Sequence, residues 1–227
     1  MDLTQYPVFP WVIKDYESEK LDLLKHETYR DLSKPIGALG EQKRLNDFRM
    51  RYNESPEGDK YMYGSHVSCP GYVIGFHLRK NPQLMIKFQS GKFDNPNRMF
   101  KGIKDCWEGC MTSSTDVKEL IPEFFMSDKA IFENKLNLEL GLRSNGEKVN
   151  NVNLPNWATN AEDFLIKQKQ ALESSFVSNN IHKWIDLVFG YKQNSFEDDN
   201  VYHPCSYEGN IDLTTVNDPN LRNALET

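Results

Sequence analysis

The sequence predicts a mainly α-helical fold in one domain of 227 residues, with irregular segments between the helices. Apolar side chains recur at helical spacing in several stretches, whereas strand signals are weak and do not alternate with helices as a doubly wound sheet requires. Aromatic residues make up 12% of the chain, which indicates a real core rather than disorder. No internal repeat and no convincing boundary divides the chain, so a single domain is expected.

The chain opens with an extended segment rich in aromatic residues. Residues 6–13 read YPVFPWVI, and the prolines Pro7 and Pro10 disfavour a helix and favour extended backbone. Because so much apolar surface on an extended strip is costly to expose, we expect this segment to be buried.

Two helices are expected in the next third of the chain. Their inward faces carry Leu45, Phe48 and Tyr52 in the first helix, and Tyr72, Val73 and Phe76 in the second. The second pattern stops at Asn81 and Pro82, and the apolar run at residues 84–88 is expected to form a short strand. Polar residues between Tyr52 and Tyr61 indicate a surface loop.

Helix start signals also mark the middle of the chain. Asn95 has the side chain to cap a helix that begins at Pro96. The inner face of that helix would carry Phe100, Ile103, Trp107 and Cys110. Asp116 and Glu119 have the spacing of a capping box, which predicts a short helix limited by Pro122.

Two further amphipathic helices are expected towards the end of the chain. Thr159 and Glu162 form a second capping box, and the residues that follow it at helical spacing are Phe164, Leu165, Gln168 and Leu172. The strongest amphipathic pattern consists of Ile181, Trp184, Ile185 and Val188. Gly190 ends this helix, Trp184 faces the core, and residues 194–200 form a loop.

The cellular compartment is predicted from signals that the sequence lacks. No stretch approaches the roughly 20 apolar residues of a membrane-spanning helix, and the first residues resemble neither a secretory nor a transit signal. Four scattered cysteines are too few for a disulfide framework, so we expect reduced thiols and a cytoplasmic protein.

Charge is distributed unevenly along a chain whose net charge is −6. Residues 79–104 hold seven basic side chains and only one acid, Asp94. Such a segment could contact anionic lipid headgroups, each Lys or Arg contributing about 1 kcal/mol near the membrane surface. A solvated helix face is the simpler interpretation.

The sequence contains no complete catalytic motif of the kinds considered below. Ser90-Gly91-Lys92 lacks the earlier glycine of a phosphate loop, and the serine and histidine at 65 and 66 lack a nucleophile elbow. Zinc could be held by His66, Cys69, Cys106 and Cys110, but core thiols are favoured because the spacing matches no standard zinc site. We therefore expect no enzyme, no cofactor and no nucleic-acid partner, with a zinc hydrolase that uses Cys106 and Cys110 as a weaker alternative.

Charged residues stand inside several hydrophobic strings. Buried charges need hydrogen-bonded partners, so one interpretation is a buried polar network. The other is a charged groove that receives a partner, whose candidate partner-binding residues are Arg30, Lys34, Glu119, Glu123 and Lys192.

The same strings closely resemble the BEACH domain, named for the beige and Chediak-Higashi proteins. Their order and rough spacing agree with the family along the whole chain. The matching blocks are YPVFPW at 6–11, RDLSKPIGAL at 30–39, GKFD at 91–94, DVKELIPEFF at 116–125, ALESSFVS at 171–178, WIDLVFGYKQ at 184–193 and YEG at 207–209.

The resemblance implies a single multi-helical BEACH-like domain, spanning residues 1–227 and incomplete at both ends, with a core of extended segments that lack regular secondary structure. Members of the family are non-catalytic scaffolds of vesicle traffic, lysosome size, autophagy or receptor signalling. The partners implied are an adjacent PH-like domain, WD repeats and other trafficking proteins, with peripheral contact to endosomal or lysosomal membranes. No catalytic residue, metal or cofactor is carried over.

Overall fold

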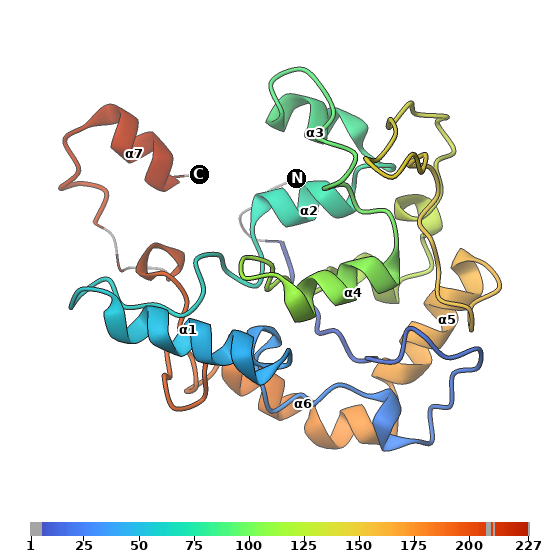
Figure 1. Ribbon diagram of the computed structural model, residues 1–227, viewed down its shortest axis with the longest axis horizontal. Coiled ribbons are helices and arrows are strands. Elements are labelled where there is room, and N and C mark those ends of the chain that lie inside the picture. The colour runs from blue at the N-terminus through green and yellow to red at the C-terminus, as the bar shows by residue number, and fades with distance from the viewer. Residues whose placement is uncertain (1–5, 208–209, 211, 227) are drawn as a thin grey trace.

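Helices and irregular segments make up the fold, shown in Figure 1 as a computed structural model that describes residues 6–207, 210 and 212–226. Within these residues the α-helices are α1 (Gln42–Glu54), α2 (Pro70–Phe76), α3 (Pro82–Phe88), α4 (Ile103–Thr112), α5 (Ala161–Leu172), α6 (Ser175–Val188) and α7 (Pro219–Glu226). The short 3-10 helices are η1 (His26–Thr28), η2 (Ile36–Ala38), η3 (Pro122–Phe125), η4 (Lys129–Ile131) and η5 (Pro204–Ser206). The described residues pair only in isolated β-bridges, so the predicted mainly α fold is confirmed.

The opening segment is extended and buried, as predicted. Phe9 and Leu120 exchange two backbone hydrogen bonds of 2.9 and 2.8 Å in an antiparallel bridge. Trp11 is completely buried, and its ring lies 5.4 Å from that of Trp107 in α4. In Figure 1 this segment, in blue, runs between α4 and α6. An extended strip therefore occupies the position that a helix would have in an ordinary helical bundle.

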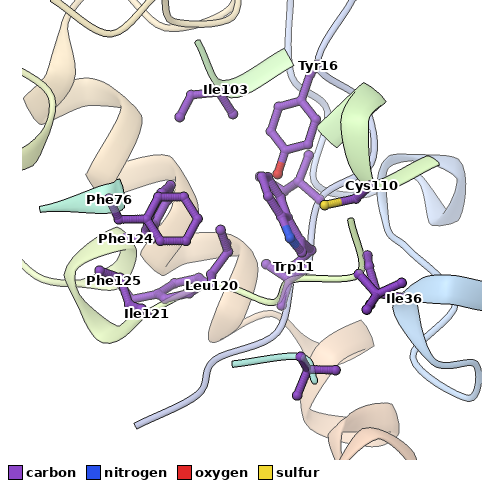
Figure 2. Close-up of a cluster of buried hydrophobic side chains, with 14 of the residues drawn as sticks. Trp11, Tyr16, Ile36, Phe76, Ile103, Cys110, Leu120, Ile121, Phe124 and Phe125 are labelled. Carbon is purple, nitrogen blue, oxygen red and sulfur yellow. The ribbon is translucent and has the colours of Figure 1, made fainter. Parts of the chain in front are cut away.

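Aromatic rings fill the centre of the core. Phe124 of η3 lies 5.0 Å from Phe76 of α2, 5.4 Å from Phe132 and 5.8 Å from Phe100, measured between ring centroids. Figure 2 shows Phe76 and Phe124 packed together. Edge-to-face pairs of this kind contribute about 0.5 to 1.5 kcal/mol each beyond area burial. The rings thus hold together segments that share few backbone hydrogen bonds.

The strand predicted at residues 84–88 is wrong, because these residues form α3. Pro82 is the first residue of that helix, where its missing N–H removes no hydrogen bond. The Asn81-Pro82 pair therefore begins one helix rather than ending another. An apolar run this short does not distinguish strand from helix by its periodicity.

Two helix starts in the middle of the chain are also wrong. Asn95 accepts a hydrogen bond from the Asn97 N–H in a turn, and α4 begins only at Ile103, whose N–H donates to the Asn153 carbonyl at 3.0 Å. Residues 116–121 form no helix, and Pro122 begins η3 instead of limiting a helix. The Glu119 N–H donates to the Val67 carbonyl at 2.9 Å. Contacts with distant segments replace the local capping bonds at both places.

The helices predicted around Phe48, Val73, Phe164 and Trp184 are confirmed as α1, α2, α5 and α6. The N-cap of α5 is Asn160, one residue after the predicted Thr159. The loop predicted after Tyr52 begins slightly later, because α1 continues to Glu54. Within the YEG block, residues 208 and 209 lie outside the described residues.

Because Gly37 of η2 has no Cβ, the Tyr63 ring can approach its backbone closely. A Cβ added at Gly37 would lie 2.2 Å from Cε1 of Tyr63, whose buried ring packs on Phe48 and whose hydroxyl donates to the Asp199 carbonyl. We expect Gly37→Ala to lower the free energy of unfolding by about 1 to 3 kcal/mol in urea denaturation, as overpacking does.

Gly75→Ala is the matched control, since no atom lies within 4 Å of the added Cβ in α2. It should leave stability unchanged or raise it by up to about 1 kcal/mol, because alanine favours a helix. Equal effects of the two substitutions would contradict the packing described here.

Candidate interaction site

The carboxylate of Glu119 connects three distant parts of the chain. Its Oε2 accepts hydrogen bonds from Nη1 of Arg30 at 2.7 Å and from the backbone N–H of Trp11 at 3.0 Å. Its Oε1 accepts from Nε1 of Trp184 in α6 at 3.0 Å. The side chains of Arg30 and Glu119 are 0% and 1% exposed. Each charge is therefore neutralised inside the core, where an unpaired charge would be strongly destabilising.

Backbone carbonyls complete this group. Nη2 of Arg30 donates to the Lys34 carbonyl at 3.2 Å, and Nε1 of Trp11 donates to the Lys118 carbonyl at 3.0 Å. We call Trp11, Arg30, Glu119 and Trp184 the Glu119 cluster. Each member comes from a different string that the sequence analysis singled out, or from the opening segment.

A second buried carboxylate, that of Glu123, lies in η3. Its Oε1 accepts a hydrogen bond from the Tyr6 hydroxyl and lies 3.1 Å from Nε2 of His77. Burial opposes ionisation of Glu123, but the hydrogen bonds from His77 and Tyr6 outweigh it and lower the pKa of this carboxyl. Burial, followed by the hydrogen bond to Glu123 and the charge of that carboxylate, raises the pKa of the Tyr6 phenol.

The five predicted partner-binding residues do not converge on one groove. Arg30, Glu119 and Glu123 are buried among the contacts above, which favours the buried-network interpretation for these three. Lys34 is exposed beside η2. Lys192 is half-buried, and its Nζ lies 2.6 Å from Oδ1 of Asp198, whose hydrogen bond raises the pKa of the lysine. Only Lys34 and Lys192 are placed where a partner would reach them.

An exposed apolar surface adjoins Lys192 at the end of α6. Ile185 and Phe189 lie one helical turn apart and are 44% and 61% exposed, and Tyr191 is 80% exposed. We call Ile185, Phe189, Tyr191 and Lys192 the α6 surface. The Phe189 ring packs edge-on against Trp184, with 5.8 Å between ring centroids. The surface is thus supported from inside by the Glu119 cluster.

The sequence analysis did not predict this surface, although apolar residues on both sides of α6 indicate it. The amphipathic pattern of α6 correctly placed Trp184 in the core, where it is 4% exposed. Ile185 was assigned to the same inward face, but it is exposed on a second apolar face with Phe189. Apolar residues on both sides of a helix are a signal that one side contacts something outside the fold.

The basic segment at residues 79–104 is largely engaged within the protein. Arg79 is buried, its Nε and Nη1 donate to the carbonyls of Asn150 and Phe100, and burial lowers its pKa to about 10. Four more basic residues form ion pairs, Lys80 with Asp128, Arg98 with Asp94, Lys101 with Asp105 and Lys104 with Glu17. Among the described residues of this segment, Lys87 and Lys92 are the basic side chains that neither form an ion pair nor donate to buried carbonyls as Arg79 does.

Two features sought in the structure are a metal-binding group of side chains and a membrane-spanning helix. In the part of the chain that the structure describes, no group of three or more His, Cys, Asp or Glu side chains is placed to hold a metal ion. Cys106 and Cys110, on which the zinc alternative was built, therefore belong to no such group among the described residues. The same residues include no helix with the length and apolar character needed to cross a bilayer.

Comparison with known proteins assigns a family to this arrangement. A model of the Beige/BEACH domain matches residues 1–227. The chain is 47% identical to BEACH domain-containing protein lvsD of Dictyostelium discoideum over 230 residues, which cover 98% of this chain and 8% of that protein. It is 45% identical to Protein SPIRRIG of Arabidopsis thaliana over 234 residues, covering 97% of this chain and 6% of that protein. The chain thus spans less than a tenth of the length of these relatives.

The Glu119 cluster predicts a strong dependence of folding on one carboxylate. Glu119→Gln leaves Arg30 as a buried charge without its counterion, so the free energy of unfolding in urea should fall by about 3 to 5 kcal/mol. Glu139→Gln is the matched control, because Glu139 pairs with Lys148 at 3.2 Å on the surface. The control should change stability by no more than about 0.5 kcal/mol. A small loss in Glu119→Gln would show that the cluster is not what holds these segments.

Glu123 predicts a stability that depends on pH. Because the folded state lowers the pKa of Glu123 below the ordinary 4.5, its ionised form stabilises the protein above that pH. This contribution is lost as the pH falls below about 4.5 towards the folded-state pKa. We expect wild type to exceed Glu123→Gln in unfolding free energy at pH 7 and the difference to shrink by pH 3. A difference independent of pH would contradict the assignment.

Proposed function

The chain belongs to the Beige/BEACH family, and we propose that it acts as a non-catalytic interaction module within a much larger protein. The observation that carries this proposal is the α6 surface. Large exposed apolar side chains clustered at one helix end are typical of protein interaction sites. Their support by the buried Glu119 cluster gives a partner a rigid surface, which limits the entropy lost on binding.

The partner that we propose for the α6 surface is a PH-like domain of the same parent protein. The resemblance of the sequence to BEACH scaffolds, which carry such a domain beside this one, supports this choice. Tyr191 and Phe189 provide aromatic contact area of the kind enriched in interface centres, and Lys192 provides charge at their edge. The size of the relatives, to which this chain matches over 6 to 8%, is consistent with a module among many.

The cellular setting forms part of the same proposal. We infer a cytoplasmic role in membrane and vesicle traffic, in lysosome-related, autophagic or receptor-signalling processes, on the periphery of endosomal or lysosomal membranes. WD repeats and other trafficking proteins are the further partners. Direct binding of anionic membrane by residues 79–104 is less favoured, because ion pairs and burial already engage five of the seven basic side chains.

Thermal unfolding of the purified chain, alone and mixed with the PH-like domain, tests the proposal. Binding to the native state stabilises it by about 2.7 kcal/mol when the partner is present at 100 times its Kd, so Tm should rise on mixing. Tyr191→Ser should remove most of this rise without changing the Tm of the chain alone, since the Tyr191 ring is exposed.

Leu24→Ser is the matched control. Leu24 is also exposed and apolar, but it precedes η1, whose His26 packs on Phe176 in the first turn of α6. The control should keep the full rise in Tm. A folded chain whose Tm does not respond to the PH-like domain, or a Leu24→Ser variant that fails as badly as Tyr191→Ser, would refute the assignment of the surface.

A further inference from the structure

A groove that the proposed function does not use lies between α4 and the α2–α3 pair, which Figure 1 shows above α4. Its volume is about 670 Å³. Apolar rings such as Phe76, Phe88 and Phe100 line it together with Cys106 and Lys118. A small molecule in this groove therefore meets a thiol and an ammonium group beside apolar walls.

Two cysteines lie one turn apart on α4 at this groove. Cys106 is half-buried and lines the groove, whereas Cys110 is completely buried. Figure 2 shows the sulfur of Cys110 pointing toward the side of the core that holds Trp11 and Tyr16. Sγ of Cys110 lies 3.5 Å from the Lys118 carbonyl and 3.7 Å from Oδ1 of Asp116. The two thiols also interact with each other through a hydrogen bond.

Lys118 brings a positive charge to the same place. Its Nζ pairs with the Asp116 carboxylate, lies 5.6 Å from the centroid of the Tyr72 ring and interacts with the Cys106 thiol. The other titratable groups that interact with these thiols or with Lys118 are Tyr16 from the opening segment, Arg44 of α1, Cys69 beside α2 and Tyr72 of α2. Asp116 is the one carboxylate among these groups.

The surroundings favour a thiolate at Cys106 rather than at Cys110. The hydrogen bond from Cys110 lowers the pKa of Cys106, and the charge of Lys118 acts in the same direction, although burial opposes both. For Cys110 the shared hydrogen bond and burial raise the pKa. This order agrees with the geometry, because Cys106 borders the open groove and Cys110 is enclosed.

We propose that Cys106 is a redox modification site, at which a small peroxide enters the groove and oxidises the sulfur to a sulfenic acid. The Cys106 thiolate attacks one oxygen of hydrogen peroxide, an S–O bond forms and the O–O bond breaks. Hydroxide leaves and takes a proton from solvent to become water, while the sulfur is oxidised by two electrons. Lys118 positions the thiolate and faces the departing negative charge.

The rate of alkylation at each cysteine tests whether the Cys106 thiol ionises more readily than an ordinary thiol. The full chain is treated with iodoacetamide at pH 6.0 to 8.5, and peptide mass spectrometry follows Cys106 and the exposed Cys205 in the same sample. An ordinary thiol loses about tenfold in rate for each pH unit below its pKa, because only the thiolate reacts. We expect the rate at Cys106 to fall less steeply than this as the pH is lowered.

The modification itself is tested with hydrogen peroxide, followed by dimedone to trap sulfenic acid. Cys106 should be labelled at peroxide concentrations that leave Cys205 unlabelled. Labelling of both cysteines to the same extent, no reaction of Cys106 in the folded chain, or parallel pH profiles would each overturn the proposal.

Variants distinguish a lowered pKa at Cys106 from mere exposure of Cys106 in the groove. Cys110→Ala removes the hydrogen-bond donor and should restore a steeper pH profile at Cys106, whereas Cys69→Ser should leave the profile unchanged. Lys118→Arg keeps the charge and should keep the flat profile. Circular dichroism confirms that each variant is folded before its rates are compared, and a flat profile in Cys110→Ala would count against the role of the pair.

Discussion

The buried ion pair of Arg30 and Glu119 is the constraint on which the rest of the structure depends. A carboxylate inside the core is strongly unfavourable unless hydrogen-bond donors surround it, and here the donors come from the opening segment, residue 30 and α6. Those segments must therefore occupy one relative position. Without a sheet among the described residues to align them, the directional hydrogen bonds of one carboxylate provide much of the geometric specification.

The position of the α6 surface follows from the same constraint. Trp184 uses its indole N–H to reach Glu119, and its ring packs against that of Phe189. The exposed side chains are thus connected to the interior by a single residue with two contacts. A partner that binds there meets a helix end whose orientation the core has already fixed, and little rearrangement is needed on association.

Several elements were predictable from sequence because local chemistry decides them. Two prolines within residues 7–10 exclude a helix, and the apolar period of α6 identifies the buried face that contains Trp184. The two false helix starts, at Asn95 and Asp116, occurred where distant contacts decide the structure. Residues 116–121 have a capping pattern, but the amide of Glu119 bonds Val67 and its carboxylate bonds Arg30, so no helix forms. The candidate site was only partly predictable, because spacing marks charged strings without showing which charges are buried and which are exposed.

The separation of the Glu119 cluster along the chain affects its synthesis. Trp11 leaves the ribosome first, yet the carboxylate that binds its amide and the helix that covers it are made much later. At about 5 to 20 residues per second, the wait between Trp11 and Trp184 is on the order of ten seconds or longer. Until Trp184 is made, the aromatic, extended strip lacks the part of its native cover that α6 provides. The nascent chain thus exposes an apolar segment of the kind that makes incomplete chains prone to aggregate.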